Sequence, residues 1–133
     1  MASPRLPEKM IEASYYLWKG EEAIVAEDSK SRYYMDQFFN VIDEAITEVH
    51  AENKDKHCML QMRGTLNQVA IARVHINAWL EGNDRWNYNM FRVCSGDIAR
   101  THSELKTLLV DDWGYSKPTM RDYAKYGAGG NCC

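Results

Sequence analysis

Apolar side chains recur at helical intervals along most of this sequence. Near the N-terminus, Met10, Leu17 and Ile24 are spaced by seven residues, which places them on one face of a helix. The next segment alternates steps of three and four, the spacing of a buried helical face, at Met35, Phe38, Ile42, Ala45 and Val49. The pattern predicts two amphipathic helices separated by the polar stretch 28–31, where Ser29 or Ser31 is suited to cap the second.

Two more long helices are predicted in the second half of the chain. The third runs from about 57 to 81, and Gly82 is suited to end it in a left-handed conformation. Asn83 or Asp84 is suited to cap the fourth. The apolar positions that define these two helices are Met62, Leu66, Val69, Ile76 and Leu80, followed by Trp86, Met90, Cys94, Ile98, Leu105 and Leu108.

Helix-breaking residues are rare between these segments. The three prolines stand at 4, 7 and 118, so nothing of that kind interrupts 8–117. Gly20 predicts a kink or an end in the first helix, and Gly96 predicts a bend in the fourth or the close approach of another backbone. No segment alternates with the period of a strand. We therefore expect an all-α bundle of four long antiparallel helices with a short C-terminal fifth helix, forming a single domain over 1–126 with a flexible Gly-rich tail at 127–133.

The composition fits one globular domain. The chain has 133 residues, of which 45% are hydrophobic and 26% are charged. Its longest apolar runs, such as 108–110, are far shorter than the roughly 20 residues that span a bilayer, so we expect no membrane partner. Without a continuous apolar segment of the kind found in secretion signals near the N-terminus, the expected compartment is the cytoplasm.

The mild net charge of −3 conceals two unlike halves. Residues 1–53 carry 5 basic and 11 acidic side chains, a net charge of −6, whereas residues 54–133 carry 11 basic and 8 acidic, a net charge of +3. This division suits a nucleic-acid-binding face. It equally suits a bundle that packs its acidic half against its basic half.

The segment 109–125 contains the most specific local pattern. Its apolar positions flank a glycine that is followed by an aromatic residue and a serine: Leu109, Val110, Trp113, Gly114, Tyr115, Ser116, Met120 and Tyr123. This arrangement resembles a DNA-binding helix-turn-helix. The resemblance implies that Ser116 caps a recognition helix whose exposed residues contact DNA, namely Lys117, Thr119, Arg121 and Lys125.

A second interpretation of the same segment requires no DNA. Gly114 ends the fourth helix, and residues 116–118 begin a short fifth helix that packs back on the bundle through Tyr123 and Tyr126. Both interpretations remain open from sequence.

Arg73 lies in the apolar stripe of the third helix and requires either a partner or access to water. If the third and fourth helices are antiparallel neighbours, Asp97 falls at a comparable height. We expect either an Arg73–Asp97 ion pair or an arginine that extends its charged end into solvent.

Catalytic and metal motifs are not found. The four histidines, at 50, 57, 75 and 102, lack the Glu-x-x-His spacing of di-metal bundles, and phosphate-binding glycine loops are missing. We predict no cofactor, no metal and no catalytic residue.

The four cysteines fall into two groups. Cys58 and Cys94 fall in apolar helical segments and are expected in the core. Cys132 and Cys133 end the chain in a way that resembles the double-cysteine prenylation tail of Rab-type GTPases, and their thiols are expected to cross-link under oxidising conditions.

Adjacent aromatic pairs supply the candidate protein interface. Successive residues point about 100° apart on a helix, so one narrow stripe cannot bury both members of a pair. The residues expected to meet a partner are Tyr16, Tyr33, Tyr34, Phe39 and Trp86.

The leading functional hypothesis is a non-enzymatic interaction protein that binds a protein partner or a second copy. A regulatory, inhibitory or assembly role and a viral origin are among the options. DNA binding is the alternative, and an enzyme or metal-binding bundle without a familiar motif is third.

Overall fold

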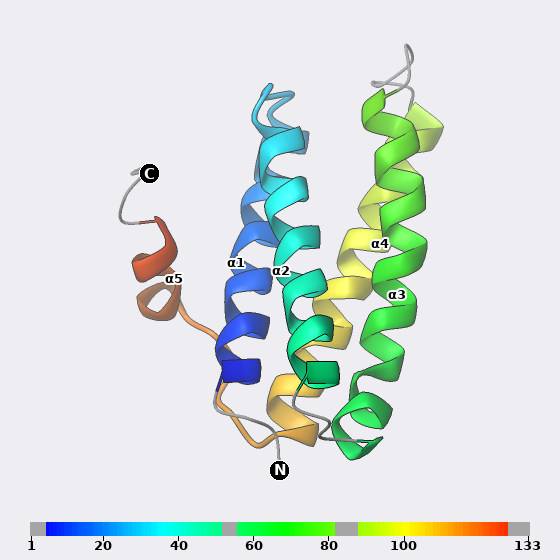
Figure 1. Ribbon diagram of the computed structural model, residues 1–133. Coiled ribbons are helices and arrows are strands. Elements are labelled where there is room, and N and C mark those ends of the chain that lie inside the picture. Colours follow the sequence, from blue (N-terminus) through cyan, green and yellow to red (C-terminus); the bar gives the residue numbers. More distant parts are fainter. Residues whose placement is uncertain (1–4, 52–55, 82–87, 128–133) are drawn as a thin grey trace.

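A computed structural model describes residues 5–51, 56–81 and 88–127. Every regular element within these ranges is helical, which confirms the all-α expectation (Figure 1). The elements are α1 (Arg5–Val25), α2 (Ser31–Ala51), α3 (Lys56–Glu81), α4 (Tyr88–Lys106), the π-helical segment η1 (Thr107–Asp112) and α5 (Met120–Gly127). None of the described helices is both long and apolar enough to cross a membrane.

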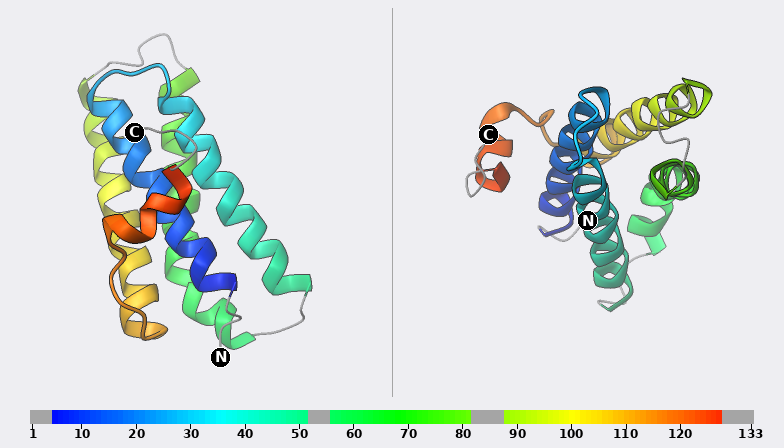
Figure 2. Two further views of the ribbon diagram at one scale, coloured as in Figure 1. Left: turned by 90° about the vertical axis from the view of Figure 1, so that its left-hand side faces the viewer. Right: turned by 90° about the horizontal axis from the view of Figure 1, so that it is seen from above.

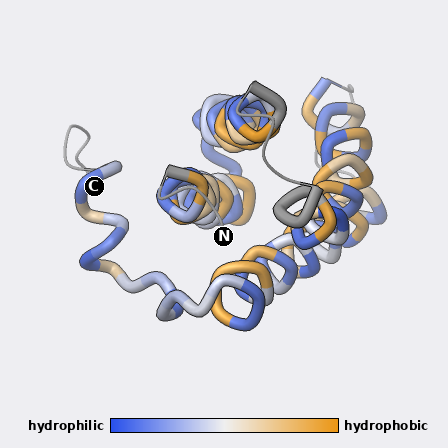
Figure 3. The backbone as a smooth tube through the Cα atoms, turned by 60° about the horizontal axis from the view of Figure 1, so that its bottom comes forward, coloured by the Kyte–Doolittle hydropathy of each residue, from blue (hydrophilic) through white to orange (hydrophobic). Residues whose placement is uncertain are grey.

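The four long helices form two antiparallel hairpins. The most extensive contacts lie within the hairpins, α1 with α2 and α3 with α4, and the hairpins meet through α1 with α4 and α2 with α3. The short α5 lies against the outer side of α1, on the opposite edge of the bundle from α3 (Figures 1 and 2). The segment that leads to α5 is mostly hydrophilic, in contrast with the long helices (Figure 3).

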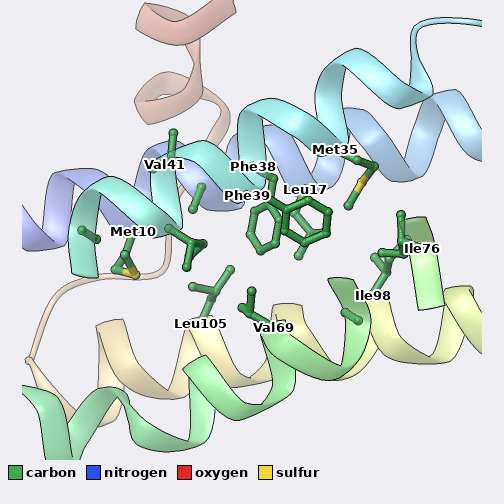
Figure 4. Close-up of a cluster of buried hydrophobic side chains, with 14 of the residues drawn as sticks. Met10, Leu17, Met35, Phe38, Phe39, Val41, Val69, Ile76, Ile98 and Leu105 are labelled. Carbon is green, nitrogen blue, oxygen red and sulfur yellow. The ribbon is translucent and has the colours of Figure 1, made fainter. Parts of the chain in front are cut away.

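The core lies between the hairpins and draws apolar side chains from all four long helices (Figure 4). Phe38 of α2 and Trp79 of α3 are among its largest members, and both are almost completely buried. The periodic positions predicted from sequence in α2 all belong to this core. Its labelled members in Figure 4 are Met10, Leu17, Met35, Phe38, Phe39, Val41, Val69, Ile76, Ile98 and Leu105.

Gly20 does not end α1 and lies at the contact between α1 and α2. A Cβ atom at this position would lie 2.5 Å from the Met35 sulfur, so a larger residue would require the buried Met35 side chain to shift. The helix continues to Val25, and Glu27 then takes a left-handed conformation with φ of 55°. The Asp28 N–H donates to the Ala23 carbonyl across this turn, which satisfies a carbonyl at the helix end.

Gly96 likewise lies within a continuous α4. The atoms nearest to the place that a Cβ would take there belong to the Arg100 side chain, at 3.4 Å, so a folded-back side chain, and not another backbone, lies beside this glycine. The expected cap at 83 or 84, the stop at Gly82, and the side chains of Trp86 and Cys58 lie outside the residues that the structure describes, as does the tail beyond Gly127.

The expected Arg73–Asp97 ion pair is wrong. Arg73 instead makes a two-pronged contact with Asp43 of α2, with both N–O distances 3.0 Å, and its guanidinium lies over the Phe39 ring. Asp97 is bound by His75 of α3 and Arg100 of α4. Asp97 does lie at the level of this turn of α3, as expected from the antiparallel pairing of α3 and α4. Position 73, however, faces α2, whereas position 75, about 200° further around the helix, faces α4.

This difference predicts the outcome of double-mutant cycles. Arg73→Ala and Asp43→Ala are expected to show a coupling of about 0.5 kcal/mol in the free energy of unfolding, since both partners are roughly half exposed. Arg73→Ala and Asp97→Ala are expected to be additive. Urea unfolding of the single and double variants measures both couplings, and a larger coupling for the Arg73/Asp97 cycle would contradict the observed pairing.

Candidate protein interaction site

The outward side of α3 carries a row of exposed residues that we call the α3 outer stripe. Its members are Leu60, Gly64, Asn67, Ile71, Val74 and Ala78, all of them exposed. The steps between them are four, three, four, three and four residues, which is the heptad spacing of a helix that packs lengthwise against another helix. The stripe therefore has the periodicity of a helix–helix contact.

The apolar members of this stripe are exposed to an unusual degree. Leu60 is 65% exposed, Ile71 is 50% exposed and Val74 is 68% exposed. The opposite side of the same helix is buried in the core, through Met62, Val69, Ala72, Ile76 and Trp79. A surface helix normally places polar residues opposite its core face. The helix α3 thus has two apolar sides, and its own bundle covers only one of them.

Polar residues border the stripe on the side of α4. Gln61 accepts a hydrogen bond from the Trp113 indole N–H at 2.8 Å, and His75 contacts Asp97. Next to the stripe, the carboxylate of Glu104 lies over Gly64, 2.9 Å from the place of a Cβ atom. On the opposite border, Arg63 is exposed. The apolar row thus has a polar rim, as protein interfaces have.

The interface residues expected from sequence differ in their burial. Tyr33 is 54% exposed, and Tyr16 and Tyr34 are half-buried in edge-to-face contacts with their aromatic neighbours, Tyr15 and Tyr33. Phe39 is 2% exposed and belongs to the core. The prediction of an exposed Phe39 is wrong because α2 packs against both α1 and α3, so a wide arc of its surface is buried.

The apolar residues of the outer stripe were missed by sequence reasoning that looked for aromatic pairs. A signal for them was present, because 60, 67 and 74 recur at sevens, and so do 64, 71 and 78. The same helix carries a second apolar row, however. Only the placement of α2 and α4 decides which of the two rows is buried.

The helix-turn-helix arrangement is not formed in the described part of the chain. Seven residues, 113–119, separate η1 from α5, whereas this motif joins its helices by a turn of three or four. Gly114 does take the left-handed conformation, with φ of 74°. The expected anchors Tyr115 and Met120 are exposed, and α5 packs on α1. The alternative expectation is confirmed in its packing, because Tyr123 and Tyr126 of the fifth helix contact α1. Its boundaries differ, since the long helix and η1 end at Asp112 and α5 begins at Met120, not at 116–118.

Ser116 is not the cap of α5. Pro118 disfavours helical geometry at the residue before it, so the helix begins after the proline. Thr119 is the cap, because its N–H and hydroxyl both donate to the Asp122 carboxylate, at 2.8 and 3.1 Å. That carboxylate is at the helix end where a DNA phosphate would approach, and it would repel one.

The four candidate DNA-contact residues therefore do not form one reading surface on a helix. Thr119 is engaged in the cap, and Lys117 lies in the connection before the helix. Arg121 is exposed, and the Lys125 ammonium lies 5.2 Å from the centre of the Tyr126 ring.

A polar cluster of His75, Asp97 and Arg100 joins α3 to α4 beside the outer stripe. The Asp97 carboxylate is almost completely buried, 2.6 Å from His75 Nδ1 and 2.8 Å from an Arg100 nitrogen. Two hydrogen-bonding partners at this distance offset the cost of burying the charge.

Cys94, one turn earlier on α4, is completely buried, as expected from sequence. Desolvation, with a smaller contribution from the negative charge of Asp97, raises the pKa of the Cys94 thiol to about 12.

Metal binding finds no support in the described residues, since no three His, Cys, Asp or Glu side chains gather there in a way that could hold an ion.

The raised pKa of Cys94 predicts an inert thiol. In a variant with Cys58, Cys132 and Cys133 replaced by serine, the folded chain at pH 8 is expected not to react with Ellman's reagent, because almost no thiolate is present well below a pKa of about 12. Absorbance during a denaturant series measures the reaction, which should begin only with unfolding. Rapid reaction of the native chain would contradict the burial of Cys94.

Comparisons with protein-family models, with curated proteins and with solved structures found no match for this chain.

Proposed function

We propose that this protein is a non-enzymatic interaction protein, and that it pairs with a second copy of itself through the α3 outer stripe. The observation that carries the proposal is the row of six exposed positions at heptad spacing, three of them Leu, Ile or Val. Such a pair is suited to a regulatory, inhibitory or assembly role. In the cytoplasm, where thiols stay reduced, it requires no disulfide.

An antiparallel arrangement of the two α3 helices matches large side chains with small ones. If the twofold axis passes at the level of residue 69, Leu60 lies opposite Ala78 of the second copy and Gly64 lies opposite Val74. Asn67 then lies opposite Ile71, close to the axis. Each layer of the contact contains a larger and a smaller or polar residue, which favours close approach of the two helices, and the Glu104 side chain beside Gly64 has to turn outward to admit Val74.

A parallel arrangement packs less well. It stacks Gly64 on Gly64 and Ala78 on Ala78, and these two layers would be nearly empty. Empty layers forfeit the dispersion contacts that a helix pair depends on. Packing therefore favours the antiparallel pair.

The borders of the stripe also suit the antiparallel self-pair. In this arrangement Arg63 lies opposite Asn77, Gln68 lies opposite Gln68, and Gln61 lies opposite His75. No two like charges meet, as they would if Arg63 faced its own copy. A polar Asn67 near the axis is the kind of residue that fixes the register of a helix pair.

The expected affinity is modest. Fully burying a leucine, isoleucine or valine contributes about 1.5–3 kcal/mol, and the three apolar side chains of the stripe are only half to two-thirds exposed at the start. Six such side chains supply roughly 6–12 kcal/mol, of which association consumes about 4 kcal/mol or more. Pairing is therefore expected to depend on protein concentration.

The solution mass tests the proposal. With reductant present, light scattering over a concentration series is expected to show a monomer that converts to a dimer. Val74→Glu is expected to hold the chain as a monomer, because it places a charge within the apolar row, opposite Gly64 of the second copy. Val25→Glu is the matched control, since Val25 is 66% exposed at the end of α1 and lies away from the stripe. A monomeric wild type at every concentration, or equal effects of both variants, would overturn the proposal.

Disulfide trapping tests the antiparallel arrangement. Leu60→Cys and Ala78→Cys are prepared separately in the background that lacks Cys58, Cys132 and Cys133. Within one chain these positions are about 27 Å apart along α3, too far for a bond. Mild oxidation is expected to cross-link a mixture of the two variants, as seen on a non-reducing gel, and to leave each variant alone uncross-linked. Cross-linking of Leu60→Cys with itself would indicate a parallel pair.

A further inference from the structure

A cavity of about 420 Å³ lies between α1, the end of α4 and the connection to α5. None of the residues that line it lies on α3, which carries the outer stripe. Its size falls within the range of small-molecule sites. The residues that line it are Ser14, His102, Ser103, Lys106, Leu109, Lys117, Pro118 and Tyr123.

The wall of this cavity is positively charged. Lys106 and Lys117 both line it, and none of its lining residues is acidic. Among the residues that the structure describes, neither lysine forms an ion pair, whereas Lys9 and Lys19 are each paired with a glutamate. Two lysines that line one cavity, neither of them paired with a carboxylate, attract an anion.

Hydrogen-bond donors face the same space. The Ser14 and Tyr123 hydroxyls are 2.8 Å apart, and a bond between two hydroxyls uses only one of their two protons. The second proton remains to be donated to a ligand. Burial lowers the pKa of His102, and its Nε2 lies 3.8 Å from the Glu21 carboxylate, so this imidazole adds no free positive charge to the cavity. The positive charge of the cavity therefore comes from the lysines.

The cavity is built on fixed elements. The Tyr123 ring stacks on Trp18 at 5.7 Å and contacts Tyr15 at 5.8 Å, which holds α5 against α1. Leu109, which lines the cavity, belongs to the π-helical segment η1, and π-helical turns are frequent at functional sites. The lining residues from α1, η1 and α5 thus keep their places without a ligand.

We propose that this cavity binds a small organic molecule that carries a phosphate group. Lysine ammonium groups bind phosphate as point charges. A phosphate monoester carries a charge of about −1.5 to −2 at pH 7, so the two lysines that line the cavity attract it more strongly than a carboxylate with its single charge. The volume exceeds the needs of a phosphate alone. The apolar surfaces of Leu109, Pro118 and the Tyr123 ring are available for the organic part.

Titration with phenyl phosphate tests the proposal, monitored by calorimetry and by backbone NMR shifts. Saturable binding that shifts the signals of Ser103 and Lys106 is expected, with inorganic phosphate and benzoate binding more weakly. Lys106→Met with Lys117→Met is expected to weaken binding by a factor of about ten or more, because each lysine supplies a charged hydrogen bond.

The matched control is Lys125→Met, an exposed lysine of α5 outside the cavity lining, which is expected to bind phenyl phosphate like the wild type. Circular dichroism verifies that each variant is folded, and both cavity lysines are exposed enough to be replaced without loss of the core. The absence of saturable binding, equal affinity for benzoate, or equal loss in the Lys125 control would overturn the proposal. None of these residues lies on α3, so the result is independent of self-pairing.

Discussion

The burial of one apolar core between two helical hairpins is the constraint on which the rest of this structure depends. Each long helix has to remove an apolar face from water, and the hairpins α1–α2 and α3–α4 do so against each other. Within the first hairpin, the Met35 side chain occupies the space that a side chain at Gly20 would take. Once these helices are placed, the outer stripe and the cavity are surfaces that the core leaves uncovered.

The long helices were predictable from sequence because their cause is local. A stripe of apolar residues at steps of three and four specifies a helix and its buried face together, as in α2. The beginning of α5 was not found in the same way, since the serine at 116 looks like a cap. Ser116 does not cap the helix because Pro118 disfavours helical geometry at the residue before it. The helix therefore begins after the proline, and Thr119 with Asp122 forms the cap.

The candidate sites were less predictable, because they depend on which helix flanks which. Phe39 and Tyr33 both belong to adjacent aromatic pairs in α2, yet one is in the core and the other is exposed. The α3 outer stripe and the core row of α3 have the same period, and sequence alone does not rank them. The phosphate-binding cavity unites residues from 14 to 123 that share no motif. Sites of this kind become visible only after the helices are assembled.

Two polar contacts hold α3 in the rotation that burial of its core row requires. Arg73 reaches Asp43 on α2, and His75 reaches Asp97 on α4. These positions are about 200° apart around the helix, so the contacts hold α3 from its two sides. The core row lies in one of the two arcs between them, and the outer stripe lies in the other. A rotation of α3 that buried Ile71 and Val74 would break both contacts, leave the Asp97 charge buried without the imidazole, and expose the core row. The outer stripe is thus left exposed by the burial of the core row, and the two polar contacts support the same rotation.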